Sequence, residues 1–105
     1  MCKFLVAAFA VLFVGSASAD DDRQRAYGEM SIKQNCSRCH AVALTDESAH
    51  PEAPAFRNLS QRYPIEALAE ALAEGISVGH PDMPEFRAEP EEIGAIIAYI
   101  ESLQR

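Results

Sequence analysis

Apolar positions along this chain form one continuous run near the N-terminus and, further on, shorter stretches with helical spacing. The clearest stretch lies at the C-terminal end, where Pro90 and the acidic Glu91 and Glu92 are typical of the first turn of a helix. The apolar residues that follow recur at intervals of three and four, which places them on one face of a helix: Ile93, Ile96, Ile97, Ile100 and Leu103. Tyr99 lies beside that face. We therefore predict a C-terminal helix that buries one apolar stripe.

A first helix is predicted over residues 26–35, after a charged lead-in at residues 20–25. Gly28 is unusual inside a helix, where glycine costs about 1 kcal/mol relative to alanine. A close crossing with another helix would explain it.

A middle helix is predicted over residues 65–74, because Pro64 suits a helix start and Gly75 suits its end. Leu68 and Leu72 are one turn apart and share its buried face.

Two loops separate these helices, at residues 41–53 and 76–89, and both contain prolines that stop helices. Phe56 and Leu59 are expected to pack inward from a short turn after the first loop. No β-branched stretch of useful length indicates a strand, so the pattern favours a small all-α domain.

The N-terminal apolar run, residues 4–14, follows Lys3 and is too short to span a bilayer comfortably. Residues 17–19, Ala-Ser-Ala, resemble a cleavage site for signal peptidase. We therefore predict that residues 1–19 are a cleaved signal peptide, that residues 20–105 are the mature domain, and that the protein is periplasmic. An uncleaved membrane anchor is the alternative.

The chain is acidic, with a formal net charge of −7, and loss of Lys3 with the signal would leave −8. Such a surface argues against nucleic acid as a partner. It favours docking on a partner that has a basic patch, although the acidic charge also serves solubility. We expect a monomer without a membrane span after cleavage. So short a domain is marginal on apolar burial alone, and a covalently held cofactor would complete its core.

Residues 36–40 read Cys-Ser-Arg-Cys-His, the C-x-x-C-H pattern of a haem c attachment site. Two thiols at this spacing, Cys36 and Cys39, can add across the two vinyl groups of one porphyrin. His40 is then placed beneath the iron as the proximal ligand.

Other readings of the two cysteines are less well supported. A thioredoxin-like dithiol would need a βαβ pattern, and a plain disulfide remains open for an exported protein. A zinc site would draw its remaining ligands from the three histidines of the chain, His40, His50 and His80. It would lack the second closely spaced ligand pair of structural zinc sites. The two loop histidines are otherwise expected at the surface, near the haem edge.

Met83 is the predicted distal iron ligand, because its thioether stabilises ferrous iron and raises the reduction potential. Pro81 and Pro84 flank it, and prolines leave a loop with little entropy to lose. His80 or an open, water-bound position are the alternatives. Met30, in the first helix, is expected to pack in the core.

The whole mature region resembles a short class I c-type cytochrome. Gly28 stands eight residues before Cys36, where that family has a glycine, and the resemblance implies that it crosses the C-terminal helix at Ile96 and Tyr99. Ile32 departs from the family, which usually has an aromatic residue at this position, and it would fill the crossing less tightly.

The resemblance carries over to the site. Cys36, Cys39 and His40 match the attachment motif, Pro54 in A-P-A-F matches a proline whose carbonyl accepts a hydrogen bond from the proximal imidazole, and Met83 matches the distal ligand. It implies a monohaem electron carrier, not an enzyme, that cycles between Fe(II) and Fe(III). An electron-transfer subunit of a dehydrogenase or oxidase complex, and a haem enzyme or gas sensor with an open distal site, are the alternatives.

Overall fold

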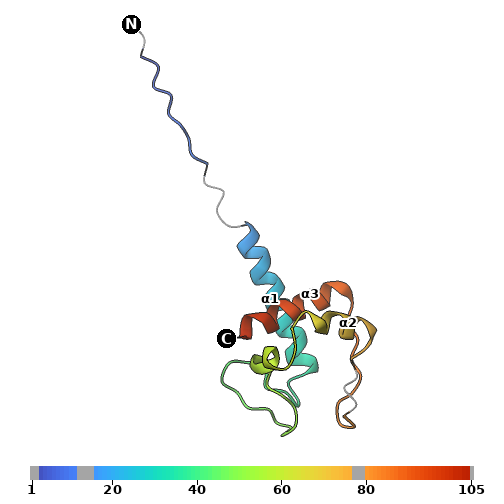
Figure 1. The fold of residues 1–105 in the computed structure, drawn as a ribbon. Helices are drawn as coiled ribbons and strands as arrows, with labels where there is room; N and C mark the ends of the chain where they lie inside the picture. Colours follow the sequence, from blue (N-terminus) through green and yellow to red (C-terminus); the bar gives the residue numbers. More distant parts are fainter. Residues whose placement is uncertain (1–2, 12–15, 77–79, 105) are drawn as a thin grey trace.

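Helices joined by long loops make up the domain (Figure 1). The computed structural model describes residues 3–11, 16–76 and 80–104. Its helical segments, in chain order, are α1 (Ser16–Asn35), the 3-10 helix η1 (Phe56–Gln61), α2 (Ala67–Glu74) and α3 (Pro90–Leu103). Within the described residues, β pairing is limited to an isolated bridge between Ile76 and Phe86. The prediction of an all-α domain is confirmed.

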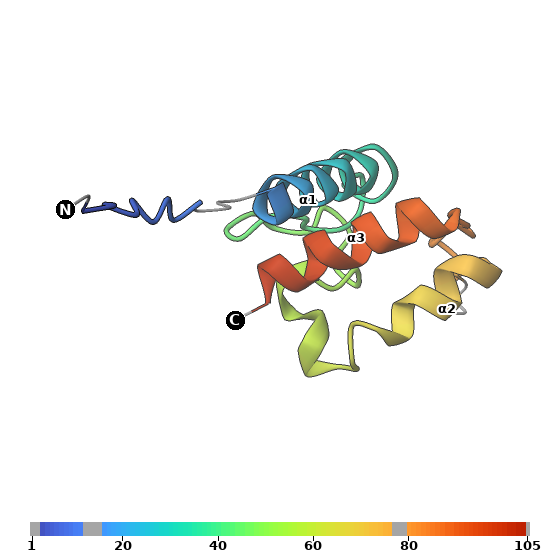
Figure 2. The same cartoon turned by 90° about the horizontal axis from the view of Figure 1, so that it is seen from above.

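Helix α3 is the centre of the fold, because it contacts α1, α2 and η1. Figure 2 shows α3 lying between α1 and α2. The closest approach to α1 is at Gly28, where an added Cβ would stand 1.9 Å from the carbonyl oxygen of Ala95 and 3.0 Å from Cβ of Tyr99. The predicted helix crossing is confirmed, with Ala95 in place of Ile96 as the nearest neighbour. Ile32 is buried at this interface, with 1% of its surface exposed.

Helix α1 begins ten residues earlier than predicted, at Ser16 instead of residue 26. The charged segment that was expected to precede the helix forms part of it. Its charges are spaced to pair along one face, as Arg23 does with Asp20 at 3.8 Å. Lys33 pairs with Glu29 at 2.8 Å nearer the C-terminal end. Such pairs each stabilise a helix by about 0.2–0.5 kcal/mol, which offsets the lack of apolar residues.

The middle helix is shorter than predicted, because α2 begins at Ala67 instead of residue 65. The residues before it form a turn in which the N–H of Leu68 donates to the carbonyl of Ile65 at 3.0 Å. Gly75 ends the helix with φ of 101°, a backbone angle that favours glycine. Pro90 opens α3 as predicted.

The core lies between α3 and the elements around it. Its large buried side chains are those of Ile32, Val42, Phe56, Leu59, Ile65, Leu68, Leu72, Ile93, Ile96, Tyr99, Ile100 and Leu103. The predictions for η1, α2 and most of the α3 stripe are confirmed, whereas Ile97 is only partly buried. Met30 was wrongly placed in the core: it is 50% exposed, because it lies on a face of α1 that α3 does not cover.

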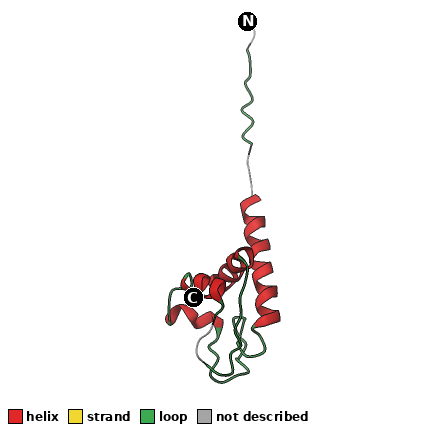
Figure 3. Cartoon of the chain, turned by 90° about the vertical axis from the view of Figure 1, so that its right-hand side faces the viewer, coloured by secondary structure: helices red, strands yellow, loops and turns green. Residues whose placement is uncertain are grey.

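Residues 3–11 run outward from the domain without secondary structure (Figures 1 and 3). Their apolar side chains are almost fully exposed, with Phe4 at 90% and Phe9 at 92%. Among the described residues, no helix combines the length and apolar character needed to cross a bilayer.

Candidate functional site

The Cys-x-x-Cys-His segment forms a tight turn at the end of α1. The N–H of Cys36 continues the helical pattern by donating to the carbonyl of Ile32 at 2.8 Å. The carbonyl of Cys36 then accepts hydrogen bonds from the N–H groups of Cys39 at 3.2 Å and His40 at 2.9 Å. The two thiols and the imidazole are partly buried, while the residues between the cysteines are exposed. The structure therefore brings the three predicted residues into one turn against the core.

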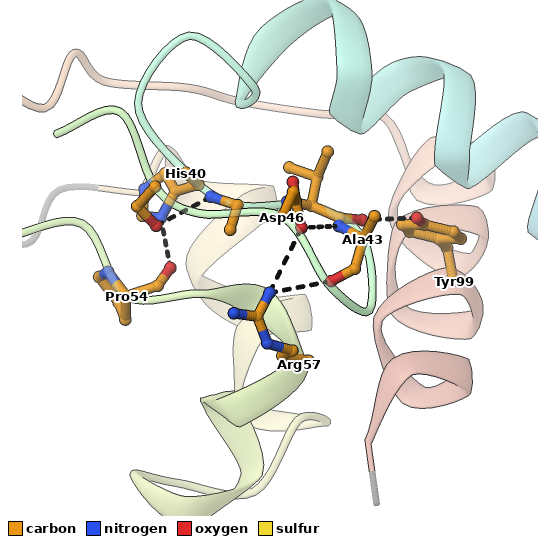
Figure 4. Close-up of polar contacts among 9 residues, drawn as sticks. His40, Ala43, Asp46, Pro54, Arg57 and Tyr99 are labelled. Atoms are coloured by element: carbon orange, nitrogen blue, oxygen red, sulfur yellow. Dashed lines mark hydrogen bonds and ion pairs between the residues drawn. The ribbon is translucent and has the colours of Figure 1, made fainter.

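The imidazole of His40 is oriented by the chain that follows the first loop. Its Nδ1 lies 2.8 Å from the carbonyl oxygen of Pro54, and the ring centroid lies 4.8 Å from that of Phe56 (Figure 4). Since a carbonyl only accepts, Nδ1 carries the proton, and Nε2 keeps a lone pair for a metal. The contact expected at Pro54 is confirmed.

Cys36 and Cys39 are both free thiols. Burial raises the pKa of the Cys36 thiol to about 11. A thiol with so high a pKa is protonated at neutral pH and is a poor nucleophile in the folded state. This argues against Cys36 as the attacking thiol of an active dithiol.

The loop after the pentad is fixed by the carboxylate of Asp46. That carboxylate accepts the N–H groups of Val42 at 2.9 Å and Ala43 at 3.0 Å, and it pairs with Arg57 at 3.3 Å (Figure 4). Burial alone raises the pKa of the Asp46 carboxyl, but the backbone N–H groups and the Arg57 guanidinium outweigh it and hold that pKa below its usual value. The carboxylate therefore stays charged and keeps the loop in place.

Tyr99 joins α3 to the same loop. Its hydroxyl donates to the carbonyl of Val42 at 2.5 Å, and the residue is buried (Figure 4). Arg57 also donates to the carbonyl of Ala43 at 3.2 Å. The side chains of Tyr99 and Arg57 thus both bind backbone carbonyls of this loop.

The loop that carries Met83 is closed at its base. The N–H of Ile76 donates to the carbonyl of Phe86 at 2.7 Å, and an added Cβ on Gly75 would stand 2.3 Å from Oε1 of Glu85. Residues 77–79 of this loop lie outside the described residues. Met83 is partly buried although its neighbours on both sides are exposed. The loop therefore directs one apolar side chain towards the protein.

The two loops contact each other through their histidines, which sequence reasoning did not predict. His50 Nε2 lies 3.0 Å from Oδ2 of Asp82, and His80 pairs with Glu52. The side chain of His50 is 27% exposed, so it is less exposed than expected. The repeated tripeptide His-Pro-acid, at residues 50–52 and 80–82, is the sequence signal that could have indicated the contact.

The donor set of the pentad fits a covalently attached haem: two thiols and an imidazole with a free Nε2 lie in one turn beside an apolar core. The zinc reading fits poorly, because the loop histidines pair with carboxylates of the opposite loops and do not join the two cysteines. The structure thus favours haem attachment at the Cys-x-x-Cys-His segment over a zinc site.

Comparison with known proteins agrees with this geometry. Residues 23–100 match the sequence model of the family described as cytochrome c oxidase, cbb3-type, subunit III. The chain is also 35% identical, over 95 residues, to cytochrome c-552 of Bradyrhizobium diazoefficiens, and the alignment covers 90% of this chain and 89% of that protein. No solved structure matches the chain.

Proposed function

Since this chain belongs to the monohaem c-type cytochromes, we propose that it is a periplasmic electron carrier. Its haem c is held covalently by Cys36 and Cys39, with His40 and Met83 as the axial ligands. When bound, haem supplies an iron that cycles between Fe(II) and Fe(III) and so accepts and releases one electron. The protein itself catalyses no bond change.

The observation that carries this proposal is the 2.8 Å contact between Nδ1 of His40 and the carbonyl of Pro54. A carbonyl acceptor on Nδ1 fixes the tautomer and turns Nε2 into the donor atom. It also raises the basicity of the ligand, as outer hydrogen bonds to ligating histidines generally do. His40 is therefore oriented as a ligand before any iron is present.

Met83 is favoured over His80 as the distal ligand. His80 pairs with Glu52, and its ring lies across that of His50, with 5.4 Å between ring centroids. Met83 is partly buried, and its neutral thioether suits a carrier of moderately high potential. The closed base of the loop keeps rearrangement small when the iron changes its oxidation state.

Export is supported by the N-terminal segment. Residues 4–11 are apolar, and their large side chains are exposed instead of packing against the domain. Cleavage after Ala19 would remove the first turn of α1 and leave Asp20, Asp21 and Asp22 at the new helix start, where carboxylates are favourable. We therefore propose residues 20–105 as the mature, monomeric domain, which meets a redox partner through that partner's basic patch.

A role as a bound electron-transfer subunit is the second candidate. It is favoured by the match of residues 23–100 to a family described by an oxidase subunit. Co-purification with a membrane complex after gentle solubilisation would support the bound form, and recovery of the protein alone would support the free carrier.

The test uses the exported, haem-loaded protein. Its mass should exceed that of the chain from Asp20 by one haem, and its ferric form should show the weak near-infrared band of a sulfur–iron bond. Met83→Ala should abolish the band, lower the potential and admit carbon monoxide to the reduced form. Met30→Ala is the matched control, because Met30 is 50% exposed, and should leave the band intact. Absence of the band in the unaltered protein, with carbon monoxide admitted by His80→Ala but not by Met83→Ala, would refute the assignment.

A further inference from the structure

The tripeptide His-Pro-acid occurs in each of the two loops that border the site. Residues 50–52 are His-Pro-Glu, and residues 80–82 are His-Pro-Asp. In each copy the N–H of the acidic residue donates to Nδ1 of the histidine two positions earlier, at 3.1 Å in both cases. The two copies therefore fold into the same local turn, and in both of them Nε2 is the ring nitrogen left to face other groups.

The copies then bind each other reciprocally. Nε2 of His50 contacts Oδ2 of Asp82 at 3.0 Å, and Nε2 of His80 contacts a carboxylate oxygen of Glu52. Donor atoms of His50, Glu52 and His80 all lie within 4.8 Å of one another. Two imidazoles and the carboxylate of Glu52 thus lie close together between the loops, and Asp82 is joined to the group through its contact with His50. The two contacts between the loops join residues that are 28 and 32 positions apart along the chain.

We propose that His50, Glu52 and His80, with Asp82 beside His50, form a binding site for a divalent transition-metal ion of the zinc type, distinct from the haem iron. Imidazole nitrogen and carboxylate oxygen are donors that Zn²⁺ accepts in tetrahedral sites, at about 2.0–2.2 Å. Donors at that distance stand about 3.3 Å from one another. The donor atoms, which lie up to 4.8 Å apart, therefore have to approach one another by roughly 1.5 Å at most. Small rotations of side chains at the surface allow such a shift.

The proton balance of binding is simple. Because Nδ1 of each ring accepts a backbone N–H, each neutral ring carries its proton on Nε2. A metal at Nε2 takes the lone pair of that nitrogen while the ring proton moves to Nδ1, so a neutral ring releases no proton. The two backbone N–H groups lose their acceptors, but both bonds are exposed and water can replace them.

The charge and the hardness of the donors select the ion. Two carboxylates neutralise a divalent cation, and the chain as a whole carries a net charge of −7. Mg²⁺ and Ca²⁺ prefer sets made of oxygen ligands alone, so two imidazoles disfavour them. Metals that accept nitrogen donors are favoured instead.

A metal at this site would connect the Cys-x-x-Cys-His turn to the loop that carries Met83. The N–H of His50 donates to the carbonyl of Cys39 at 3.1 Å, so one copy is attached to the Cys-x-x-Cys-His turn. The other copy is attached to the distal loop, because the N–H of Met83 donates to the carbonyl of His80 at 3.2 Å. A bound metal would cross-link the two loops and slow the opening of the distal one.

The test is calorimetric titration of Zn²⁺ into the haem-loaded protein, after treatment with a chelator and in a buffer that does not bind metal. We expect one Zn²⁺ per protein, and no comparable binding of Mg²⁺. His50→Ala and His80→Ala should each weaken Zn²⁺ binding more than tenfold, since loss of a mere outer-shell partner already costs about 10–100-fold. Glu52→Gln should also weaken it, whereas Glu70→Gln, which removes the same charge from an exposed site on α2, should not.

Zn²⁺ binding that survives in both histidine variants, or the absence of saturable binding, would overturn the proposal. So would binding that falls equally in Glu52→Gln and Glu70→Gln, because that would reveal a general effect of charge. The calorimetric result does not depend on the distal ligand, so Met83→Ala should still bind Zn²⁺. Failure of the Met83 assignment and failure of the metal site are therefore distinguishable.

Discussion

Gly28 allows the sharpest test of the packing, because the structure gives the clash that any side chain there would create. An added Cβ would stand 1.9 Å from the carbonyl oxygen and 2.5 Å from the carbonyl carbon of Ala95. Both are backbone atoms in the middle of α3, so no side-chain rotation can relieve the contact. To restore ordinary contact at about 3.4 Å, the helices have to separate by more than 1 Å or shift along each other.

That separation acts on the most closely packed part of the core. Overpacking of this kind costs about 1–3 kcal/mol, and a separation of whole helices lies at the upper end of that range. The intrinsic helix preference of alanine over glycine returns only about 0.5–1 kcal/mol. We therefore expect Gly28→Ala to lower the free energy of unfolding by about 1–2 kcal/mol, and Gly28→Val by more.

Gly94 supplies a matched control on the opposite helix. A Cβ there would meet the side-chain amide of Gln24 at 3.2 Å, which is the far end of a flexible side chain. Gly94→Ala should therefore be neutral or stabilise by up to about 1 kcal/mol. Denaturant unfolding of the haem-loaded proteins, followed by helix circular dichroism, measures all three variants. A Gly28→Ala protein as stable as Gly94→Ala would refute the close crossing.

Three further predictions concern the loops and the surface. Tyr99→Phe removes the hydroxyl that donates to the carbonyl of Val42 at 2.5 Å, and it should lower the free energy of unfolding by about 1 kcal/mol in denaturant while hardly changing the reduction potential of the haem. A large shift in the potential would instead place the hydroxyl at a haem propionate. The pKa of the Asp46 carboxyl is lowered in the folded state, so the stability that its charge contributes is present above the unfolded pKa of about 3.9 and is lost as the pH falls through the folded value. The Asp46→Asn variant should therefore be less thermally stable than wild type at neutral pH and approach wild type in acid. Parallel pH profiles of the two melting temperatures would contradict this. The formal charge of −7 predicts that electron transfer to a basic partner becomes slower as salt rises from low to physiological ionic strength, where charges are screened beyond a Debye length of about 8 Å. Stopped-flow mixing measures this rate. A rate that does not depend on salt would assign the charge to solubility alone.

Sequence reasoning succeeded where a local pattern has one physical explanation. The apolar stripe of α3 and the proline at its start identify a half-buried helix, and most of that stripe is buried. Gly28 indicated a close crossing because little else justifies glycine within a helix. The contact between His40 and Pro54, in contrast, came from resemblance to a family, since fourteen residues of loop separate the two.

The failures have physical causes too. The start of α1 could not be read from apolar spacing, because its first turns are held by pairs between charged residues. Met30 is apolar and lies in a helix next to the core, but only the direction of the crossing decides which face of α1 is covered. The pairing of His50 with Asp82 joins two loops distant in sequence, and the repeated His-Pro-acid tripeptide marks the two loops without specifying that they meet.

The burial of Cys36 implies an order of events during biosynthesis. Burial raises the pKa of this thiol to about 11, so it is protonated at neutral pH, and it is partly covered by the core. A chain that collapsed early would therefore shield one of its two attachment sulfurs. With the proposed attachment at Cys36, thioether formation is therefore expected to be faster while the chain is still extended. Mutations that speed early helix docking would then lower the yield of mature protein without harming the finished fold.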